Sequence, residues 1–259
     1  MVINASDFPL TAAHSPHISV VESTGSTNAD LLAHGVDADT WPHLSVLITD
    51  DQRSGRGRLD RSWQAPAGAS LALSVLLRTS EVPEPARSWV PLIAGLAMTE
   101  SIAAQLGSGV SSKWPNDVLV GDQKICGILA EMSPTGDAII VGSGVNTTMT
   151  AAQAPVETAT SFAMHDRSAH LDLLVSHYIG RVAAELQSLR EHEGDAVRSG
   201  LRDRFAAVCS TIGKVVTIHL PGGASYTGDA TGIDDDGRLL VLVDGESRTV
   251  SAGDVVHVR

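Results

Sequence analysis

The densest group of chemically capable side chains lies in one short segment of an acidic chain. Residues 51–63 read DQRSGRGRLDRSW, whereas the formal net charge of the whole chain is −12. Four arginines fall in this segment: Arg53, Arg56, Arg58 and Arg61. Guanidinium groups pair with carboxylate and phosphate oxygens, and glycines let a backbone approach a ligand closely. The segment therefore predicts a loop that closes on a small anion, with a solvated basic turn as the alternative.

A second group lies in residues 113–132, KWPNDVLVGDQKICGILAEM. Pro115 fixes a turn, so we expect Asn116 and Asp117 to be held at the edge of a sheet. An Asp beside an Asn suits ribose hydroxyls or a magnesium ion shared with phosphates. Lys124 opens an apolar strand, where an ammonium group is costly unless it meets an anion. A lysine that extends from a simple turn to solvent would give the same pattern.

Two shorter segments could also contact a ligand. Residues 141–146, VGSGVN, expose backbone at a strand end beside Asn146, but their spacing matches neither a P-loop nor a dinucleotide fingerprint. Residues 26–28, STN, open a helix, where Thr27 and Asp30 could form a reciprocal cap.

None of these groups looks like a covalent nucleophile. Ser26 has no candidate base in its motif, and Cys126 lies in an apolar strand. Catalysis by positioning and electrostatics is therefore the better interpretation.

The elements that must position these groups alternate between strands and helices. We expect strands over residues 17–23, 43–50, 69–78 and 138–148, a hairpin at 121–122, and helices over 26–35, 85–107 and 168–208. Residues 69–78 alternate like a half-buried strand, and Pro91 either bends the second helix or marks its start. The pattern predicts a mixed α+β domain with a largely antiparallel sheet.

The composition changes near Thr211. From there the chain has short alternating strands broken by PGG, DDDG and DGE, which predicts a small all-β barrel of about 50 residues. We therefore divide the chain into residues 1–208 and 209–259, and expect the barrel to dock on the larger domain.

Composition excludes several classes of protein. The negative charge argues against a surface that tracks nucleic acid. No apolar run approaches the roughly 20 residues of a membrane span, and the amino terminus lacks the pattern of an export signal. Two cysteines are too few for a disulfide framework or a metal knuckle. We expect a soluble, cytoplasmic protein that binds neither nucleic acid nor membrane.

Together and in this order, the motifs resemble the biotin–protein ligase family. The match runs through GSTNADLL, DQRSGRGRLDRSW, KWPNDVLVGDQKICGILAE, VGSGVN and the terminal barrel. It implies a sheet of the class II synthetase and lipoate-ligase type followed by an SH3-like barrel. About 20 residues precede the first expected strand, too few for the helix-turn-helix domain of many members, so we expect the monofunctional type.

The resemblance implies a two-step reaction. Biotin and ATP form biotinyl-5'-AMP and pyrophosphate, with Mg²⁺, and the biotinyl group passes to one lysine of a biotin carboxyl carrier domain. That domain would belong to an acyl-CoA or pyruvate carboxylase. We expect a monomer or a weak homodimer.

The resemblance also implies roles for individual residues. Lys124 and Arg58 would be catalytic, with Lys124 stabilising charge during adenylation. Biotin contacts would come from Ser26, Thr27, Asn28, Gln52, Gly55, Arg56, Arg58 and Lys124. Nucleotide contacts would come from Arg58, Arg61, Trp63, Asn116, Asp117 and Asn146. The magnesium ligands stay unassigned, and we expect the arginine loop to be mobile until ligand binds.

Two other functions fit parts of the pattern. A lipoate or octanoate ligase or transferase of related fold also acylates a carrier lysine. A metabolite-sensing binding module is the other alternative, although the acidic chain and the single lysine of the barrel argue against a nucleic-acid grip.

Overall fold

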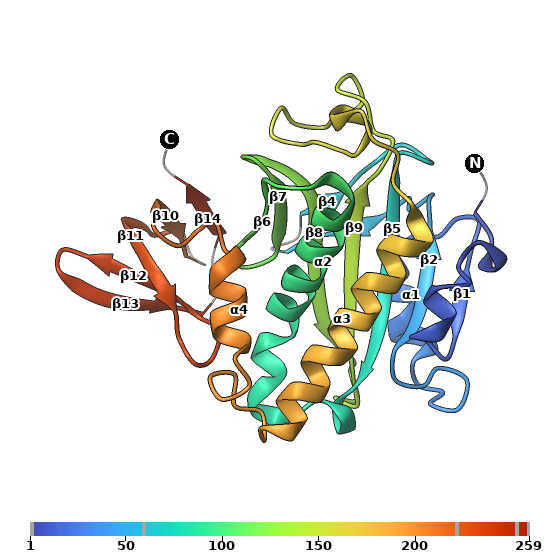
Figure 1. Cartoon of the computed structure of the whole chain (residues 1–259), viewed down its shortest axis with the longest axis horizontal. Helices are drawn as coiled ribbons and strands as arrows, with labels where there is room; N and C mark the ends of the chain where they lie inside the picture. The colour runs from blue at the N-terminus through green and yellow to red at the C-terminus, as the bar shows by residue number, and fades with distance from the viewer. Residues whose placement is uncertain (1–2, 59–60, 221–222, 252–253, 258–259) are drawn as a thin grey trace.

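The computed structural model describes residues 3–58, 61–220, 223–251 and 254–257, and its larger part is built on one seven-stranded sheet (Figure 1). The strands are β1 (Ile18–Val20), β2 (Ser45–Thr49), β5 (Ser70–Arg78), β6 (Val110–Lys113), β7 (Asp117–Val120), β8 (Gln123–Met132) and β9 (Ala138–Asn146). Their order is β1-β2-β5-β9-β8-β7-β6, in which only β1 and β2 pair in parallel. The prediction of a mixed, largely antiparallel sheet is confirmed.

Helices cover both faces of this sheet. The helices are α1 (Thr27–His34), α2 (Val90–Leu106), α3 (Leu171–Glu191) and α4 (Leu201–Val208), with short 3₁₀ turns at Ala5–Asp7, Thr11–Ala13, Thr79–Glu81, Glu84–Trp89 and Ala163–His165. Figure 1 shows α2 and α3 in front of the sheet and α1 behind it. Pro91 stands in the first turn of α2, so it marks the start of that helix rather than a bend.

The helical pattern predicted over residues 168–208 corresponds to two helices with a break between them. Helix α3 ends at Glu191, and α4 begins only at Leu201. Gly194 and Gly200 lie between them with φ of 86° and 73°, a left-handed backbone that ends one helix and redirects the chain into the next.

Strand β5 is buried at all nine positions, so its interpretation as half-buried is wrong. Leu73, Val75 and Leu77 pack in the main core, which also holds residues of α2 and α3. Leu76 points the other way and packs with Leu31 of α1. Side chains of β5 do alternate between the two faces of the sheet. Both faces are covered by helices, so neither is exposed to solvent.

A bulge between β7 and β8 changes which side chains share a face. Val118 pairs with Cys126, but the next residue, Leu119, pairs with Lys124, so one residue of β8 is extra. An extra residue reverses the alternation of side chains along a strand. Lys124 and Gly127, three positions apart, consequently lie on the same face, the one toward α1.

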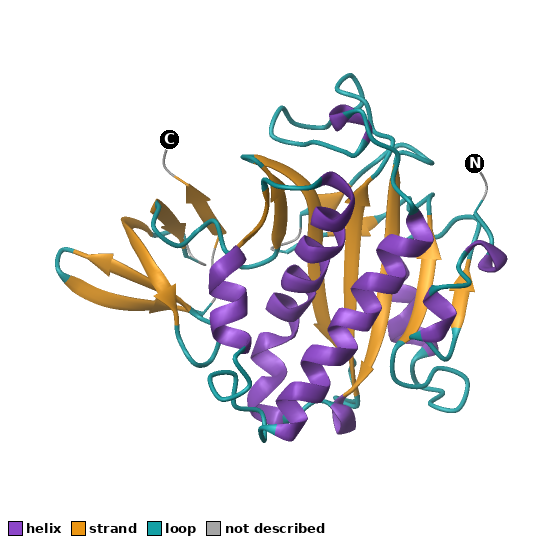
Figure 2. Cartoon of the chain, viewed as in Figure 1, coloured by secondary structure: helices purple, strands orange, loops and turns teal. Residues whose placement is uncertain are grey.

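The carboxy-terminal part is an antiparallel five-stranded sheet, at the left of Figures 1 and 2. Its strands are β10 (Val215–His219), β11 (Ser225–Ile233), β12 (Leu239–Val243), β13 (Glu246–Val250) and β14 (Asp254–His257). The order β13-β12-β11-β10-β14 suits the small barrel that the sequence predicted. The division of the chain at residues 208 and 209 remains a prediction.

Two indoles dock this barrel on the larger domain. Trp89 Nε1 donates to the carbonyl of Asp235 at 2.8 Å, and Trp114 Nε1 donates to the carbonyl of Gly237 at 3.0 Å. Gly237 has φ of 81°, and a Cβ there would lie 2.9 Å from Leu92. The DDDG turn is therefore one contact point between the two parts.

One segment has the length and hydropathy of a membrane span, contrary to expectation. It is Glu84–Leu106, which includes all of α2, and 67% of its apolar window is buried inside the fold. A core helix of a soluble protein has the same properties, and α2 packs against α3 and the sheet.

Candidate active site

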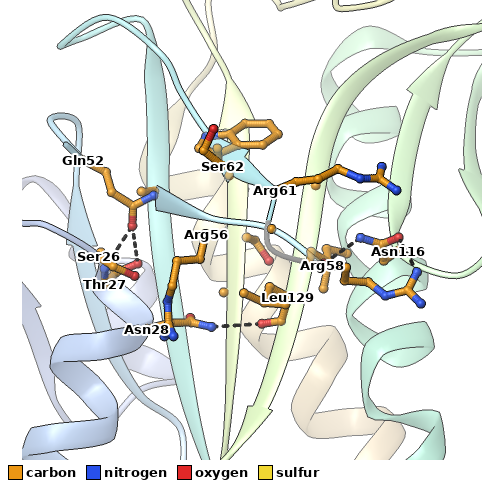
Figure 3. A pocket seen from close by; sticks show the side chains of 18 of the residues that line it. Ser26, Thr27, Asn28, Gln52, Arg56, Arg58, Arg61, Ser62, Asn116 and Leu129 are labelled. Atoms are coloured by element: carbon orange, nitrogen blue, oxygen red, sulfur yellow. Dashed lines mark hydrogen bonds between the residues drawn. The ribbon is translucent and has the colours of Figure 1, made fainter. Parts of the chain in front are cut away.

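The predicted site residues gather around one cavity on the face of the sheet that carries α1 (Figure 3). Its volume is about 130 Å³, and the arginine loop covers it with a two-stranded hairpin, β3 (Gly55–Arg56) and β4 (Ser62–Trp63). Figure 3 shows Gln52 and Thr27 on one side and Arg58 with Asn116 on the other. The lining residues that the sequence predicted are Ser26, Thr27, Asn28, Gln52, Arg56, Arg58, Arg61, Trp63, Asn116, Asp117 and Lys124.

Glycines on two paired strands form the floor of the cavity. Gly127 of β8 pairs with Gly144 of β9. A Cβ on Gly144 would lie 2.5 Å from Cε2 of Trp63, and one on Gly127 would lie 3.0 Å from Cζ3 of the same indole. The backbone thus admits a flat group at van der Waals distance, and Trp63 now fills that place. Its Nε1 is buried and has no hydrogen-bond partner among the described residues.

The first turn of α1 supplies a polar wall. Gln52 Oε1 accepts hydrogen bonds from Thr27 N at 2.9 Å and from Thr27 Oγ1 at 3.1 Å. Because a backbone N–H can only donate, this contact fixes the orientation of the Gln52 amide. Nε2 then faces the loop, 2.5 Å from where a Cβ on Gly55 would stand. The wall therefore presents a donor, and Gly55 leaves room for it.

The helix cap differs from the predicted one. Ser26 is the N-cap, and its Oγ accepts from Ala29 N at 3.4 Å. Asp30 accepts from the Thr24 hydroxyl instead of returning to Thr27. The reciprocal cap of Thr27 and Asp30 is therefore wrong, because Thr27 already lies inside the helix and serves the wall.

Hydrogen bonds hold both ends of the Asn28 side-chain amide. Its Nδ2 donates to the Leu129 carbonyl at 3.1 Å and to Glu131 Oε2 at 2.8 Å, while its Oδ1 accepts from Ser74 at 2.6 Å. A Cβ on Gly142 would lie 2.3 Å from that Oδ1. Both amide hydrogens are used inside the protein, so Asn28 shapes the wall.

The opposite end of the cavity is charged. Lys124 Nζ lies 2.5 Å from Asp117 Oδ1 and 5.6 Å from the centre of the Trp63 ring. Asp117 Oδ1 makes no hydrogen bond within the described part of the chain, so the contact is an ion pair without hydrogen-bond alignment. The lysine that opens the apolar strand is thus half-buried and paired with an anion, as the sequence suggested.

Arg58 brings the loop to the same end. It donates from NH1 to Asn116 Oδ1 at 3.3 Å, and Asn116 Nδ2 donates to the Ile128 carbonyl at 2.9 Å. The described residues contain no cluster of three or more His, Cys, Asp or Glu side chains arranged to hold a metal ion. Asp117 and Asn116 are nevertheless oxygen donors at the mouth of the site.

The two cysteines are free and buried. Burial raises the pKa of the Cys126 thiol far above its usual value, mainly through desolvation. A thiol that stays protonated is a poor nucleophile, which supports catalysis without a covalent enzyme intermediate.

Two predicted residues do not line this cavity. Gly55 packs against the side-chain amide of Gln52, which separates it from the cavity. Asn146 ends β9, where its Nδ2 donates to the Thr160 carbonyl at 2.8 Å and its buried Oδ1 has no partner in the described chain. Residues 59–60 of the loop lie outside the described residues.

No site role was predicted from the sequence for Ser74, Gly127 or Glu131. Gly142 and Gly144 lie in VGSGVN, a segment predicted to expose backbone to a ligand, but neither has a predicted contact of its own. The spacing of two between Gly142 and Gly144 was a usable signal, because it places both on one face of a strand. Ser74 and Glu131 carried no local signal.

A second cavity of about 520 Å³ adjoins the first and shares Arg58 and Asn116 with it. Its far wall is the barrel turn, with Asp236, Gly237 and Arg238. A ligand too long for the first cavity can therefore extend toward the barrel.

Known proteins resemble this chain in both of its parts. Residues 20–146 match the Biotin/lipoate A/B protein ligase family, and residues 211–258 match the Biotin protein ligase C terminal domain. The biotin–[acetyl-CoA-carboxylase] ligase of Mycobacterium tuberculosis is 41% identical over 254 residues, which cover 93% of this chain and 89% of that protein.

Two further likenesses extend over most of the chain. The bifunctional ligase/repressor BirA of Escherichia coli is 30% identical over 243 residues, covering 92% of this chain and 72% of that protein. Among solved structures, a biotin protein ligase from Aquifex aeolicus in complex with biotin and ATP superposes with a TM-score of 0.77 at 25% identity. The superposition covers 94% of this chain and 99% of that one.

Proposed function

This chain belongs to the biotin protein ligase family, and from that premise we propose how its cavity works. The protein is a biotin–[acetyl-CoA-carboxylase] ligase, which activates biotin with ATP and transfers it to a carrier lysine. The observation that carries the assignment of the site is the Lys124–Asp117 pair beneath an arginine-bearing loop, at the end of a glycine-floored cavity.

Biotin would bind between the polar wall and the glycine floor. Gln52 Nε2 offers a donor to the urea-like carbonyl of the ring head, while Ser26 and Thr27 border the same end. The floor at Gly127 and Gly144 leaves space for the apolar ring and chain once Trp63 moves off it. An unpaired urea group would cost binding energy in a closed pocket, which explains a wall with its amide orientation fixed.

The first chemical step brings two anions together. A biotin carboxylate oxygen attacks the α-phosphorus of ATP, and the bond to the pyrophosphate oxygen breaks. Two unit charges 4 Å apart repel by about 4 kcal/mol at an effective dielectric of about 20. Lys124 and Arg58 offset this repulsion at the transition state. Lys124 would exchange Asp117 for the carboxylate and α-phosphate as ligands arrive.

The nucleotide would lie along the charged end of the site. Arg58, Arg61 and Trp63 of the loop and Asn116 and Asp117 of the turn supply cations, a ring and oxygen donors there. The polyphosphate can extend into the adjoining cavity. Asn146 lies away from both cavities and would act by holding the segment around Thr160.

Magnesium fits this end of the site as a companion of the nucleotide. Mg²⁺ is commonly held by one or two carboxylates together with substrate phosphates, and Asp117 with Asn116 provides that kind of donor set. When bound, the ion would neutralise phosphate charge, while Lys124 and Arg58 orient the reacting oxygens.

In the second step the amine of the acceptor lysine attacks the acyl carbon, and AMP leaves. The acceptor is a carboxylase carrier domain, and we propose that it is a biotin carboxyl carrier domain of an acyl-CoA or pyruvate carboxylase. We place the protein in the cytoplasm, as a monomer or a weak homodimer. No contact with nucleic acid or membrane is required.

A transfer assay tests the proposal. The protein is incubated with biotin, ATP, Mg²⁺ and a biotin carrier domain, and the carrier is weighed by mass spectrometry. We expect one biotinyl group on one lysine, and none when ATP is left out. Lipoate and octanoate replace biotin in parallel reactions. Preferred transfer of either acid would overturn the biotin assignment in favour of the lipoate-ligase alternative.

Binding without any transfer would favour the metabolite-sensing alternative. The match of residues 211–258 to the biotin protein ligase terminal domain supports biotin over lipoate, because the family matched by residues 20–146 includes both.

A further inference from the structure

Glu131 joins two parts of the site that are distant in sequence. Its Oε2 accepts from Asn28 Nδ2 at 2.8 Å and from an Arg56 guanidinium nitrogen at 2.9 Å. Asn28 belongs to α1, Arg56 to the loop hairpin and Glu131 to β8. One carboxylate oxygen thus holds the loop to the wall of the cavity.

The contacts form a continuous chain around the cavity. From Asn28 the chain continues through Ser74, which lies 2.7 Å from Thr27 Oγ1, and then to Gln52. Gln52 lies at the root of the same loop that carries Arg56. Movement of Arg56 and orientation of the wall are therefore linked through Glu131.

Charge alone does not explain this arrangement. The Arg56 side chain is 45% exposed, and an ion pair with that much solvent contributes little by Coulomb attraction. Asn28, by contrast, is buried, and its amide needs an acceptor for each of its two hydrogens. Leu129 accepts one, so Glu131 is required for the other.

We propose that Glu131 is a positioning residue that couples closure of the arginine loop to the orientation of the biotin-binding wall. This rests on the proposed biotin site. Glu131 does not touch the reacting atoms. Its loss frees one Asn28 hydrogen, loosens Ser74, Thr27 and Gln52, and releases Arg56 of the loop from the wall of the cavity. Biotin affinity should fall, while the chemical step at saturating substrate should not.

The test uses two substitutions of similar size. Glu131→Met removes both accepting oxygens, and Glu131→Gln keeps one. We expect the dissociation constant of biotin, measured by calorimetry, to rise about tenfold or more in the Met variant, as loss of a charge-assisted hydrogen bond predicts. The Gln variant should recover part of that affinity. The kcat of pyrophosphate release should stay within about twofold while KM for biotin rises.

Glu100→Met is the matched control, because Glu100 forms a partly exposed ion pair with Arg181 away from both cavities. Its biotin affinity should equal that of the wild type. Wild-type affinity in Glu131→Met would overturn the proposal, and so would a tenfold fall in kcat with unchanged KM.

A double-mutant cycle keeps the proposal testable if Glu131→Met fails to fold. Glu131→Gln and Arg56→Ala are measured alone and together, and coupled losses of biotin affinity are expected. Strictly additive losses would overturn the coupling. A wild-type protein that bound no biotin would instead refute the proposed site, which separates the two failures.

Discussion

At the scale of single residues, Lys124 is the side chain to which we assign charge stabilisation in the first chemical step. An ammonium group at the start of an apolar strand is stabilised by an anion, and Asp117 provides one at 2.5 Å. In the proposed mechanism, the same charge lets the lysine bind the carboxylate and the α-phosphate. In the proposed site, Asp117 is both the ion-pair partner of Lys124 and an oxygen donor on the nucleotide side.

Replacement of Lys124 tests this role. We expect Lys124→Ala to slow adenylate formation by about a hundredfold or more, the size seen when a transition-state charge partner is lost. Pyrophosphate release measures the rate. Lys214→Ala is the control, since Lys214 pairs with Asp122 away from the cavity. A near wild-type rate in Lys124→Ala would remove the lysine from the mechanism.

At the scale of elements, strands β8 and β9 form the floor of the proposed biotin cavity. The arginine loop, which carries the hairpin β3–β4, is the proposed lid. The strands β8 and β9 pair with each other inside the seven-stranded sheet, whereas the hairpin of the loop has only two residues in each strand. Short pairing with few buried contacts gives low local stability, which suits a segment that must open for ligand. The sheet strands can therefore serve as a fixed floor, whereas the short hairpin can open, because the hairpin buries little of its own surface.

The floor is tested by adding one methyl group. Gly144→Ala would place a Cβ 2.5 Å from the Trp63 indole, so the ring must shift and the flat ligand space is lost. We expect the biotin dissociation constant to rise about tenfold or more, with the thermal midpoint nearly unchanged. Gly232→Ala in β11 is the control, because its nearest neighbour would be 3.9 Å away. Equal affinity in both variants would contradict the proposed floor.

The lid is tested by hydrogen exchange. Backbone amides of residues 51–58 and 61–63 should exchange quickly in the free protein and become protected when biotin and ATP are both added. Amides of β5, buried at every position, provide the internal reference. If the loop amides are protected equally with and without ligand, the loop is a fixed wall and not a lid.

At the scale of the whole molecule, polar side chains contribute to the contact between the larger domain and the carboxy-terminal barrel. Thr211 accepts from Trp114 N at 3.0 Å and lies 3.1 Å from His257 Nε2. Lys214 Nζ lies 3.4 Å from the other ring nitrogen. Burial, aided by the charges of Lys113 and Lys214, lowers the pKa of His257 to about 4. The ring is therefore neutral at pH 7.

This lowered pKa predicts a pH dependence. Above pH 6.5, the usual value, both folded and unfolded His257 are neutral and the full stability is present. As the pH falls from 6.5 toward 4, the unfolded chain takes up a proton that the folded chain refuses, so stability falls. The loss should be about 1 kcal/mol, discounted because the ring is only partly buried.

Urea unfolding at pH 7.5 and pH 5 measures this loss. His257→Gln should reduce the difference between the two pH values, whereas His219→Gln, at an exposed position of β10, should not. An unchanged difference in His257→Gln would remove this histidine from the acid sensitivity.

The sequence by itself determined the chemistry and the class of fold. Arginines with glycines, a proline-fixed Asn–Asp turn and a lysine in an apolar strand marked the cavity, because residue type sets which ligands a side chain can meet. Alternation and turn residues likewise predicted the mixed sheet and the terminal barrel, since these signals act within a few residues.

Only the tertiary structure decided which faces of the strands, helices and loop contact one another. The bulge in β8 turns Lys124 toward Gly127, although simple alternation would separate them. Burial of β5 on both faces and the link from Glu131 to Arg56 depend on segments far apart in the chain. Strand register and layer packing join such distant segments, and no local pattern of residues encodes that pairing.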